Sequence, residues 1–461
     1  MSSLCGRRLG FVSWGAVFAA FVLTPACDRS TAIRKPAQAS SVRDDRPSFV
    51  ILLADDLGWG DVGYHGSEIQ TPNIDALART GVRLEQFYVL PICSPTRAAL
   101  LTGRYPMRYG LQAAVLKPFS EAALPVEERT LAEVLRGAGY ATAMVGKWHL
   151  GHYSPHFRPE ARGFDYFYGC YEGRTDHFMH AMWSRNGQPV LDEGYSTDRI
   201  ADEAVRLLQE RDAARPMFLF VSFTAPHEPL QAPDAAIRKY RHVADARRRV
   251  YMAMVDRMDE AIGRIVAAVD DAGMRDNTLI AFLSDNGATE DYGGDNGPLS
   301  RGKGSLYEGG VRSPAILNWP ARLAPAVEQR PLHVVDVFPT LLGLARIAPD
   351  DGRPLDGVDL WPFLTAETAP PHEELLLNVT PWDGALRIGD WKYFERRREG
   401  KRFRRLYNLR DDPAERVDLA EQYPQRLEQM AARLAEYRAQ SAELIAKPMR
   451  RPEDRPVEAN P

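Results

Sequence analysis

The sequence predicts an α/β fold, in which a large, mainly parallel or mixed sheet is sandwiched by helices and a smaller antiparallel sheet with one helix follows. Apolar, β-branched runs alternate with helical patterns between residues 48 and 370, and beyond residue 370 the pattern changes to short strand-like segments. The 461 residues are 44% hydrophobic and 10% aromatic, which suits a well-packed globular protein.

The first observation is a set of continuous apolar runs, typical of strands buried on both faces. The runs are residues 49–54, 140–145, 217–223 and 278–283. Helical patterns lie between them at residues 73–80, 131–137, 195–211 and 247–272. Because strands alternating with helices build parallel sheets, we expect helices on both faces of one sheet.

The second observation is the change of pattern near residue 370, where the Pro-containing segment 368–371 resembles a linker. Candidate strands follow at residues 375–379, 385–388, 391–394 and 405–408. Leu427, Met430, Leu434, Tyr437 and Leu444 then recur at helical spacing. We therefore expect a main domain over 48–370, a C-terminal α+β subdomain over 371–446, and a disordered, charged tail over 447–461.

The N-terminal 27 residues have the pattern of an export signal. Arg7 and Arg8 precede an apolar core at residues 9–23 that is too short to span a membrane comfortably. Cys27 follows the small residue Ala26, as in a lipoprotein cleavage site. Polar residues 28–47 fit a linker, so we expect an exported protein, periplasmic or lipid-anchored at the bacterial cell envelope through Cys27. The Sec and twin-arginine routes both stay open.

Charge and cysteine content argue against a nucleic-acid-binding protein and against a disulfide-stabilised scaffold. The 58 basic and 62 acidic residues give a net charge of −4, which provides no general surface for nucleic acid. Of the four cysteines, two fall in the export segment, and Cys93 and Cys170 remain. The chain is therefore not a disulfide scaffold.

Polar residues follow each of the four apolar runs, and in open α/β sheets ligands bind at the carboxyl ends of the strands. In chain order these residues are Asp55 and Asp56, then Lys147 and His149, then His227, and then Asp285 and Asn286, with Lys303 adding a further cation. We expect them to meet at one edge of the sheet.

Four of these residues offer only oxygen ligands: Asp55, Asp56, Asp285 and Asn286. Hard divalent cations, Ca²⁺ or Mg²⁺, take such ligands, and no His/Cys spacing for zinc is present. A pair of aspartates after a strand also fits a turn with a helix cap. The matching Asp-Asn-Gly at another strand end favours the metal site.

The pentapeptide Cys93-Ser-Pro-Thr-Arg97 lies between the apolar extended segment 84–92 and a helical run at 98–104. It matches Cys-x-Pro-x-Arg, the pattern for converting cysteine to formylglycine, an aldehyde whose hydrate serves as a nucleophile. With the strand-end residues, the chain resembles a type I sulfatase of the alkaline phosphatase superfamily, and is most similar to the arylsulfatase B (N-acetylgalactosamine-4-sulfatase) branch. The matching stretches are residues 53–61, 66–77, 93–105, 139–151, 227–231, 285–287, 306–312 and 354–358.

The resemblance implies an alkaline phosphatase-like fold and a nucleophile with a metal ion. Cys93 would be oxidised by a formylglycine-generating enzyme and act as the aldehyde hydrate, with one hydroxyl attacking sulfur. The metal, Ca²⁺ rather than Mg²⁺, would be held by Asp55, Asp56, Asp285, Asn286 and the modified Cys93.

The resemblance also implies roles for the remaining polar residues. Arg97 would steady the modified residue, while Lys147 and Lys303 would bind the sulfate. His149 would take a proton from the hydrate, so that sulfate is expelled. His227, with Lys303, would bind the substrate and assist the leaving alcohol.

The implied activity is hydrolysis of sulfate esters, on glycosaminoglycan-like carbohydrate or aryl sulfates, and the branch suggests a 4-O-sulfated hexosamine. One alternative is a phosphonate or phosphate ester hydrolase on the same fold, which the complete lysine and histidine set disfavours. Another is a lipoprotein that binds glycans without turnover. Intact Cys93 and Arg97 argue against it, because a binder needs no nucleophile.

The remaining histidines and the basic run 396–405 each allow a functional interpretation and a simpler structural one. His180 lies in a Tyr/His-rich stretch and is either a substrate contact at the mouth of the site or an ordinary loop histidine. We expect His65, His152, His156 and His177 to be surface or loop histidines. The basic run 396–405 fits a sulfated polyanion, and more simply a solvated hairpin tip.

Overall fold

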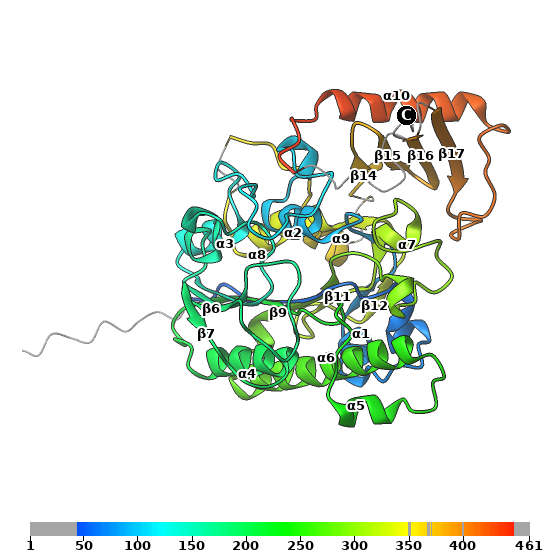
Figure 1. Cartoon of the computed structure of the whole chain (residues 1–461). Helices are drawn as coiled ribbons and strands as arrows, with labels where there is room; N and C mark the ends of the chain where they lie inside the picture. Colours follow the sequence, from blue (N-terminus) through cyan, green and yellow to red (C-terminus); the bar gives the residue numbers. More distant parts are fainter. Residues whose placement is uncertain (1–43, 349–351, 367–368, 370, 399–400, 447–461) are drawn as a thin grey trace, which may run out of the picture. The chain divides into compact units, whose positions relative to one another are not determined.

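The computed structural model describes residues 44–348, 352–366, 369, 371–398 and 401–446, and its largest element is a ten-stranded sheet (Figure 1). The strand order is β12-β2-β11-β9-β1-β8-β4-β5-β6-β7. The central, parallel strands are β9 (Thr278–Ser284), β1 (Ser48–Ala54), β8 (Met217–Ser222), β4 (Ala141–Gly146) and β5 (Tyr166–Cys170). The predicted export signal with Cys27, most of the polar linker and the C-terminal tail lie outside the described residues.

Strand β1 shows why the apolar runs are continuous. Phe49 and Ile51 pack in the core on one face of the sheet, and Val50 and Leu52 in the core on the other. Helices cover both faces (Figure 1). The first core includes residues of α2 (Cys93–Thr102), α3 (Leu131–Gly137), α8 (Val337–Leu344) and α9 (Trp361–Ala366); the second includes residues of α1 (Pro72–Thr80), α4 (Ser196–Gln209), α5 (Asp234–Lys239) and α6 (Ala246–Asp271).

Short strands make the sheet mixed at its edges. Strand β11 (Ala315–Asn318) is antiparallel to β9, and β2 (Val82–Leu84) and β12 (Ala326–Glu328) continue beyond it. At the other edge, β6 (Trp183–Arg185) and β7 (Gln188–Val190) are antiparallel. A separate three-stranded sheet contains β10 (Arg312–Ser313), β3 (Phe87–Tyr88) and β13 (Leu332–His333).

The C-terminal sheet is antiparallel, and α10 (Pro424–Ala439) packs on it through buried residues that include Leu427 and Leu434. Its strands are β14 (Glu374–Val379), β15 (Asp383–Ile388), β16 (Trp391–Arg398) and β17 (Lys401–Asn408). The predicted fold class is therefore confirmed. No helix among the described residues is long and apolar enough to cross a membrane.

The basic run 396–405 forms the distal end of the β16–β17 hairpin, and most of its described side chains are exposed, in agreement with the simpler interpretation. Strands β16 and β17 pair through it, with Arg396 opposite Phe403 and Arg397 opposite Arg402. Because a paired strand points alternate side chains to opposite faces, the run is divided between two environments.

A buried ion cluster joins the C-terminal sheet to α7 (Glu308–Val311). The Lys392 ammonium lies 2.9 Å from a carboxylate oxygen of Glu308 and 2.8 Å from one of Glu415, and the Lys392 and Glu308 side chains are fully buried. Tyr88 donates to the other Glu308 oxygen at 2.8 Å. This cluster connects β16 to the segment that follows Lys303.

We predict that Lys392→Ala lowers the free energy of unfolding by about 3–5 kcal/mol, because it removes the buried ammonium that contacts both Glu308 and Glu415. Urea unfolding would measure the change, with exposed Lys401→Ala as the control expected to stay within about 0.5 kcal/mol. Equal effects of the two substitutions would contradict the role of the cluster.

Candidate active site

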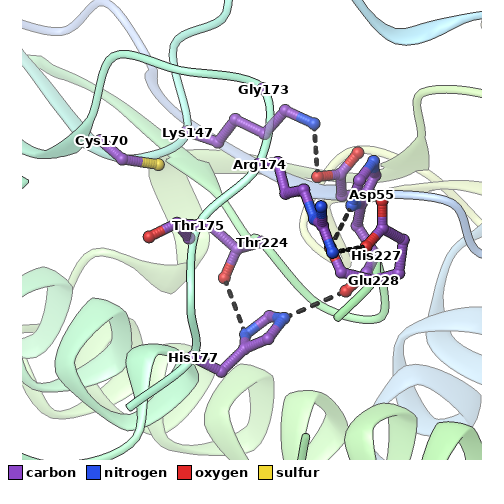
Figure 2. Close-up of a pocket in the computed structure, with 10 residues that line it drawn as sticks. All are labelled: Asp55, Lys147, Cys170, Gly173, Arg174, Thr175, His177, Thr224, His227 and Glu228. Atoms are coloured by element: carbon purple, nitrogen blue, oxygen red, sulfur yellow. Dashed lines mark hydrogen bonds and ion pairs between the residues drawn. The ribbon is translucent and has the colours of Figure 1, made fainter. Parts of the chain in front are cut away.

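The carboxyl ends of β1, β4, β8 and β9 bring most of the predicted residues together, and Figure 2 shows Asp55, Lys147 and His227 around one pocket. The aspartates directly follow β1 and β9, and Lys147 directly follows β4. The ligand atoms of Asp55, Asp56, Cys93 and His227 lie within 4.8 Å of one another. The pocket is therefore built from parallel strand ends, as the sheet topology requires.

Cys93 is the first residue of α2, and every residue of this helix is buried. Its Sγ lies 3.7 Å from Oδ1 of Asp55 and 4.0 Å from Oδ1 of Asp56. Burial, reinforced by the charge of Asp285, raises the pKa of the Cys93 thiol to about 12. The unmodified thiol is therefore a poor nucleophile at neutral pH.

Arg97, one turn further along α2, is 1% exposed. Its Nη2 and Nε donate to Oδ2 of Asp285 at 2.7 and 2.9 Å. Its Nη1 donates to the Ser222 hydroxyl at 2.6 Å and to the Lys147 carbonyl at 3.0 Å. Sequence reasoning missed Ser222, because a serine at the end of an apolar strand carries no pattern of its own.

Two lysines approach the aspartates. Lys147 Nζ lies 2.6 Å from Oδ2 of Asp55, and Lys303 Nζ lies 2.7 Å from both carboxylate oxygens of Asp56. Lys147 is buried, whereas the Lys303 side chain is 19% exposed. Cations of this kind stabilise a bound anion strongly, because the surrounding pocket excludes water.

The residues fit a hard cation. Asn286 donates from Nδ2 to Oδ1 of Asp56 at 2.6 Å, while its Oδ1 is buried with no hydrogen-bond partner among the described residues. A buried, unsatisfied amide oxygen beside Asp56 and Asp285 is an unused ligand. The oxygen-rich donor set is the kind that Ca²⁺ prefers.

The two predicted histidines present different nitrogens. His227 Nδ1 lies 2.6 Å from the Glu228 carbonyl, which leaves Nε2 facing Oδ2 of Asp56 at 3.8 Å. His149 Nε2 lies 3.0 Å from the Leu116 carbonyl, and its Nδ1 is buried without a partner in the described part of the chain. Burial lowers the pKa of His227 to about 4 and that of His149 well below its usual value.

His180 does not join this cluster. It is buried and stacked on Trp183, and its ring nitrogens lie 2.9 and 3.4 Å from the carbonyls of Asp192 and His177. Both nitrogens are thus occupied by backbone oxygens. This geometry corrects the predicted substrate contact: His180 supports the loop.

His177, expected at the surface or in a loop, is instead 1% exposed and lines the pocket (Figure 2). Its Nε2 lies 3.0 Å from the His227 carbonyl, and its Nδ1 lies 2.8 Å from the Ser196 hydroxyl. It therefore holds the backbone of His227 in place. Sequence reasoning missed this role, because the contacts come from segments distant in the chain.

An ion pair lies at the mouth of the pocket. The Arg174 guanidinium lies 2.7 Å from a carboxylate oxygen of Glu228, and the Arg174 side chain is 63% exposed (Figure 2). Glu228 directly follows His227. Both residues of this ion pair line the pocket.

The sulfatase family model matches residues 47–347, and the chain belongs to the sulfatase family. Arylsulfatase J from Mus musculus is 34% identical, covering 87% of this chain and 77% of its own length. N-acetylgalactosamine-6-sulfatase from Canis lupus familiaris is 36% identical, covering 69% of this chain and 66% of its own length. The solved structure of Ps i-CgsB in complex with k-i-k-neocarrahexaose superposes with a TM-score of 0.81 at 31% identity, covering 87% of this chain and 94% of that one.

These relationships make the protein a type I sulfatase, and thus a sulfuric ester hydrolase. The predicted 4-sulfatase branch is not confirmed by them, since the similar proteins include 6-sulfatases and arylsulfatases A and J. The family is established, and the branch stays a prediction.

We predict that Ca²⁺ raises the thermal stability of the metal-free protein, by about 2.7 kcal/mol at a hundred times its dissociation constant. Asn286→Ala should remove most of this gain, because it deletes the unused amide oxygen. Differential scanning calorimetry with and without Ca²⁺ would measure both, with exposed Asp291→Asn as the control. An undiminished gain in Asn286→Ala would contradict the site.

Proposed function

We propose that this enzyme hydrolyses sulfate esters of carbohydrate, through a formylglycine made from Cys93 and a Ca²⁺ ion held by Asp55, Asp56, Asp285 and Asn286. The observation that carries the proposal is the position of Cys93, whose Sγ lies within 4.0 Å of Asp55 and Asp56, the same carboxylates that Lys147 and Lys303 contact. Bound Ca²⁺ supplies positive charge that stabilises the oxygens of the reacting sulfate.

The two lysines would bind and orient the substrate. Lys147 follows β4 and Lys303 lies in the loop before α7, so that each can contact a nonbridging sulfate oxygen from a different side. Sulfuryl transfer concentrates negative charge on these oxygens, and fixed cations lower the energy of that state more than water does. Arg97 would act indirectly, by fixing Asp285 and tying α2 to the end of β4.

The histidines would move protons. With Nε2 of His149 donating to the Leu116 carbonyl, its Nδ1 keeps a lone pair and can accept a proton from the nucleophile. With Nδ1 of His227 donating to the Glu228 carbonyl, its Nε2 faces the pocket. A bound sulfate adds negative charge that favours the imidazolium, which then donates its Nε2 proton to the leaving alcohol.

Sulfated carbohydrate is the proposed substrate class. The structure of Ps i-CgsB contains a neocarrahexaose, and N-acetylgalactosamine-6-sulfatases are among the relatives. We propose a glycosaminoglycan-like substrate and retain the 4-O-sulfated hexosamine suggested by the sequence. Rates on 4-O- and 6-O-sulfated N-acetylgalactosamine would distinguish the positions.

Maturation and location belong to the same proposal. A formylglycine-generating enzyme would be the maturation partner, and export to the periplasm, with a lipid at Cys27, would place the enzyme with extracellular glycans. The main domain over 48–370 would carry the chemistry, and the subdomain over 371–446 would flank the site.

The first test compares release of 4-nitrophenol from its sulfate and phosphate esters, with Ca²⁺ and a co-expressed formylglycine-generating enzyme. We expect sulfate turnover to dominate and Cys93→Ala to abolish it. Dominant phosphate turnover would favour the esterase alternative. If mass spectrometry shows that Cys93 has been converted and neither ester is hydrolysed, the result would contradict an arylsulfatase activity.

A second test removes the cations one at a time. We predict that Lys147→Ala and Lys303→Ala each lower kcat by about 10²–10³, as expected for loss of one electrostatic donor. Lys239→Ala, on the surface of α5, is the matched control and should keep the wild-type rate. Wild-type kcat in both active-site variants would exclude the lysines from sulfate binding.

A further inference from the structure

A second cavity, of about 680 Å³, adjoins the active site. Lys303 belongs to both, because its Nζ contacts Asp56 while the residue lines the cavity. One wall is the loop 301–307, and the other is the face of β15, β16 and β17 that carries Asp383, Phe394, Arg396, Phe403 and Arg405.

The strand pairing explains how the basic run forms this wall. Phe394 lies opposite Arg405 and Arg396 opposite Phe403, and directly opposed residues of antiparallel strands share a face. The intervening Glu395 points the other way and pairs with Arg438 of α10 at 2.5 Å. Half of the run therefore stabilises the subdomain, while the other half faces the cavity.

The cavity has unbalanced positive charge. Within the described part of the chain, Arg301 and Arg396 make no ion pair with a carboxylate; Arg301 instead lies over the Tyr307 ring, 5.2 Å from its centre. Arg405 pairs with Asp418 at 2.7 Å. The acidic residue of the lining, Asp383, accepts the Thr380 hydroxyl at 2.5 Å.

We infer that this cavity binds a second anionic group, sulfate or carboxylate, on a sugar next to the one that carries the reacting ester. A planar guanidinium such as that of Arg396 matches either anion with two parallel hydrogen bonds. Phe403, 46% exposed beside Arg396, offers an apolar face for the sugar ring. The inference rests on the proposed function and narrows it to oligosaccharides with at least two anionic groups.

The test measures binding rather than turnover, in Cys93→Ala enzyme with Ca²⁺. Isothermal titration calorimetry would use three tetrasaccharides: one with a single sulfate and otherwise neutral sugars, one with a sulfate and a neighbouring uronate, and one with two neighbouring sulfates. We expect at least one dianionic ligand to bind about tenfold more tightly than the monoanionic ligand.

Arg396→Ala in this background should remove that advantage, and Phe403→Ala should weaken all three ligands. Arg397→Ala is the matched control, since it removes the same charge from the adjacent, exposed position on the opposite face. Equal affinities for the three ligands, or equal losses in Arg396→Ala and Arg397→Ala, would overturn the inference. Failure of the proposed function would instead appear as absent hydrolysis of 4-nitrophenyl sulfate by the matured wild-type enzyme.

Discussion

The geometry of the active site depends on one buried guanidinium, that of Arg97. From the second turn of α2 it contacts Asp285 after β9, Ser222 at the end of β8 and the Lys147 carbonyl after β4. Its Nη2 also lies 3.5 Å from Asp55 after β1. Burying such a charge is costly, and these partners offset the cost only when all four strand ends are in register. The side chain proposed to steady the nucleophile thus also fixes the edge of the sheet.

Charge balance explains how the pocket can be stable without substrate and still attract it. The carboxylates of Asp55, Asp56 and Asp285 face the cations of Arg97, Lys147 and Lys303, so that the formal charges cancel. A bound divalent cation would leave the pocket with an excess of two positive charges. A sulfate monoester carries one negative charge, so this excess positive charge would attract it. The same positive charge would then stabilise the sulfate oxygens during hydrolysis.

The sequence predicts the central fold well, because strands β1, β4, β8 and β9 are continuous apolar runs and α6 is long. It misses short edge strands such as β6 and β11, since three or four residues carry no readable period. The strand-end residues were predictable from topology. His177 and His180 were not, because their burial depends on the folding of a loop against distant segments. The division of the basic run between two faces also required the strand register.

The complete burial of α2 determines whether Cys93 can be modified before or after the chain folds. In the folded chain the Cys93 side chain is 1% exposed, and every other residue of α2 is buried with it. A modifying enzyme that acts on this thiol must therefore reach it before the sheet and α2 have packed together. The folding rate then limits the time available for this modification. A substitution that only accelerates folding would lower the fraction of modified, active molecules. The structure of the folded active site would stay the same.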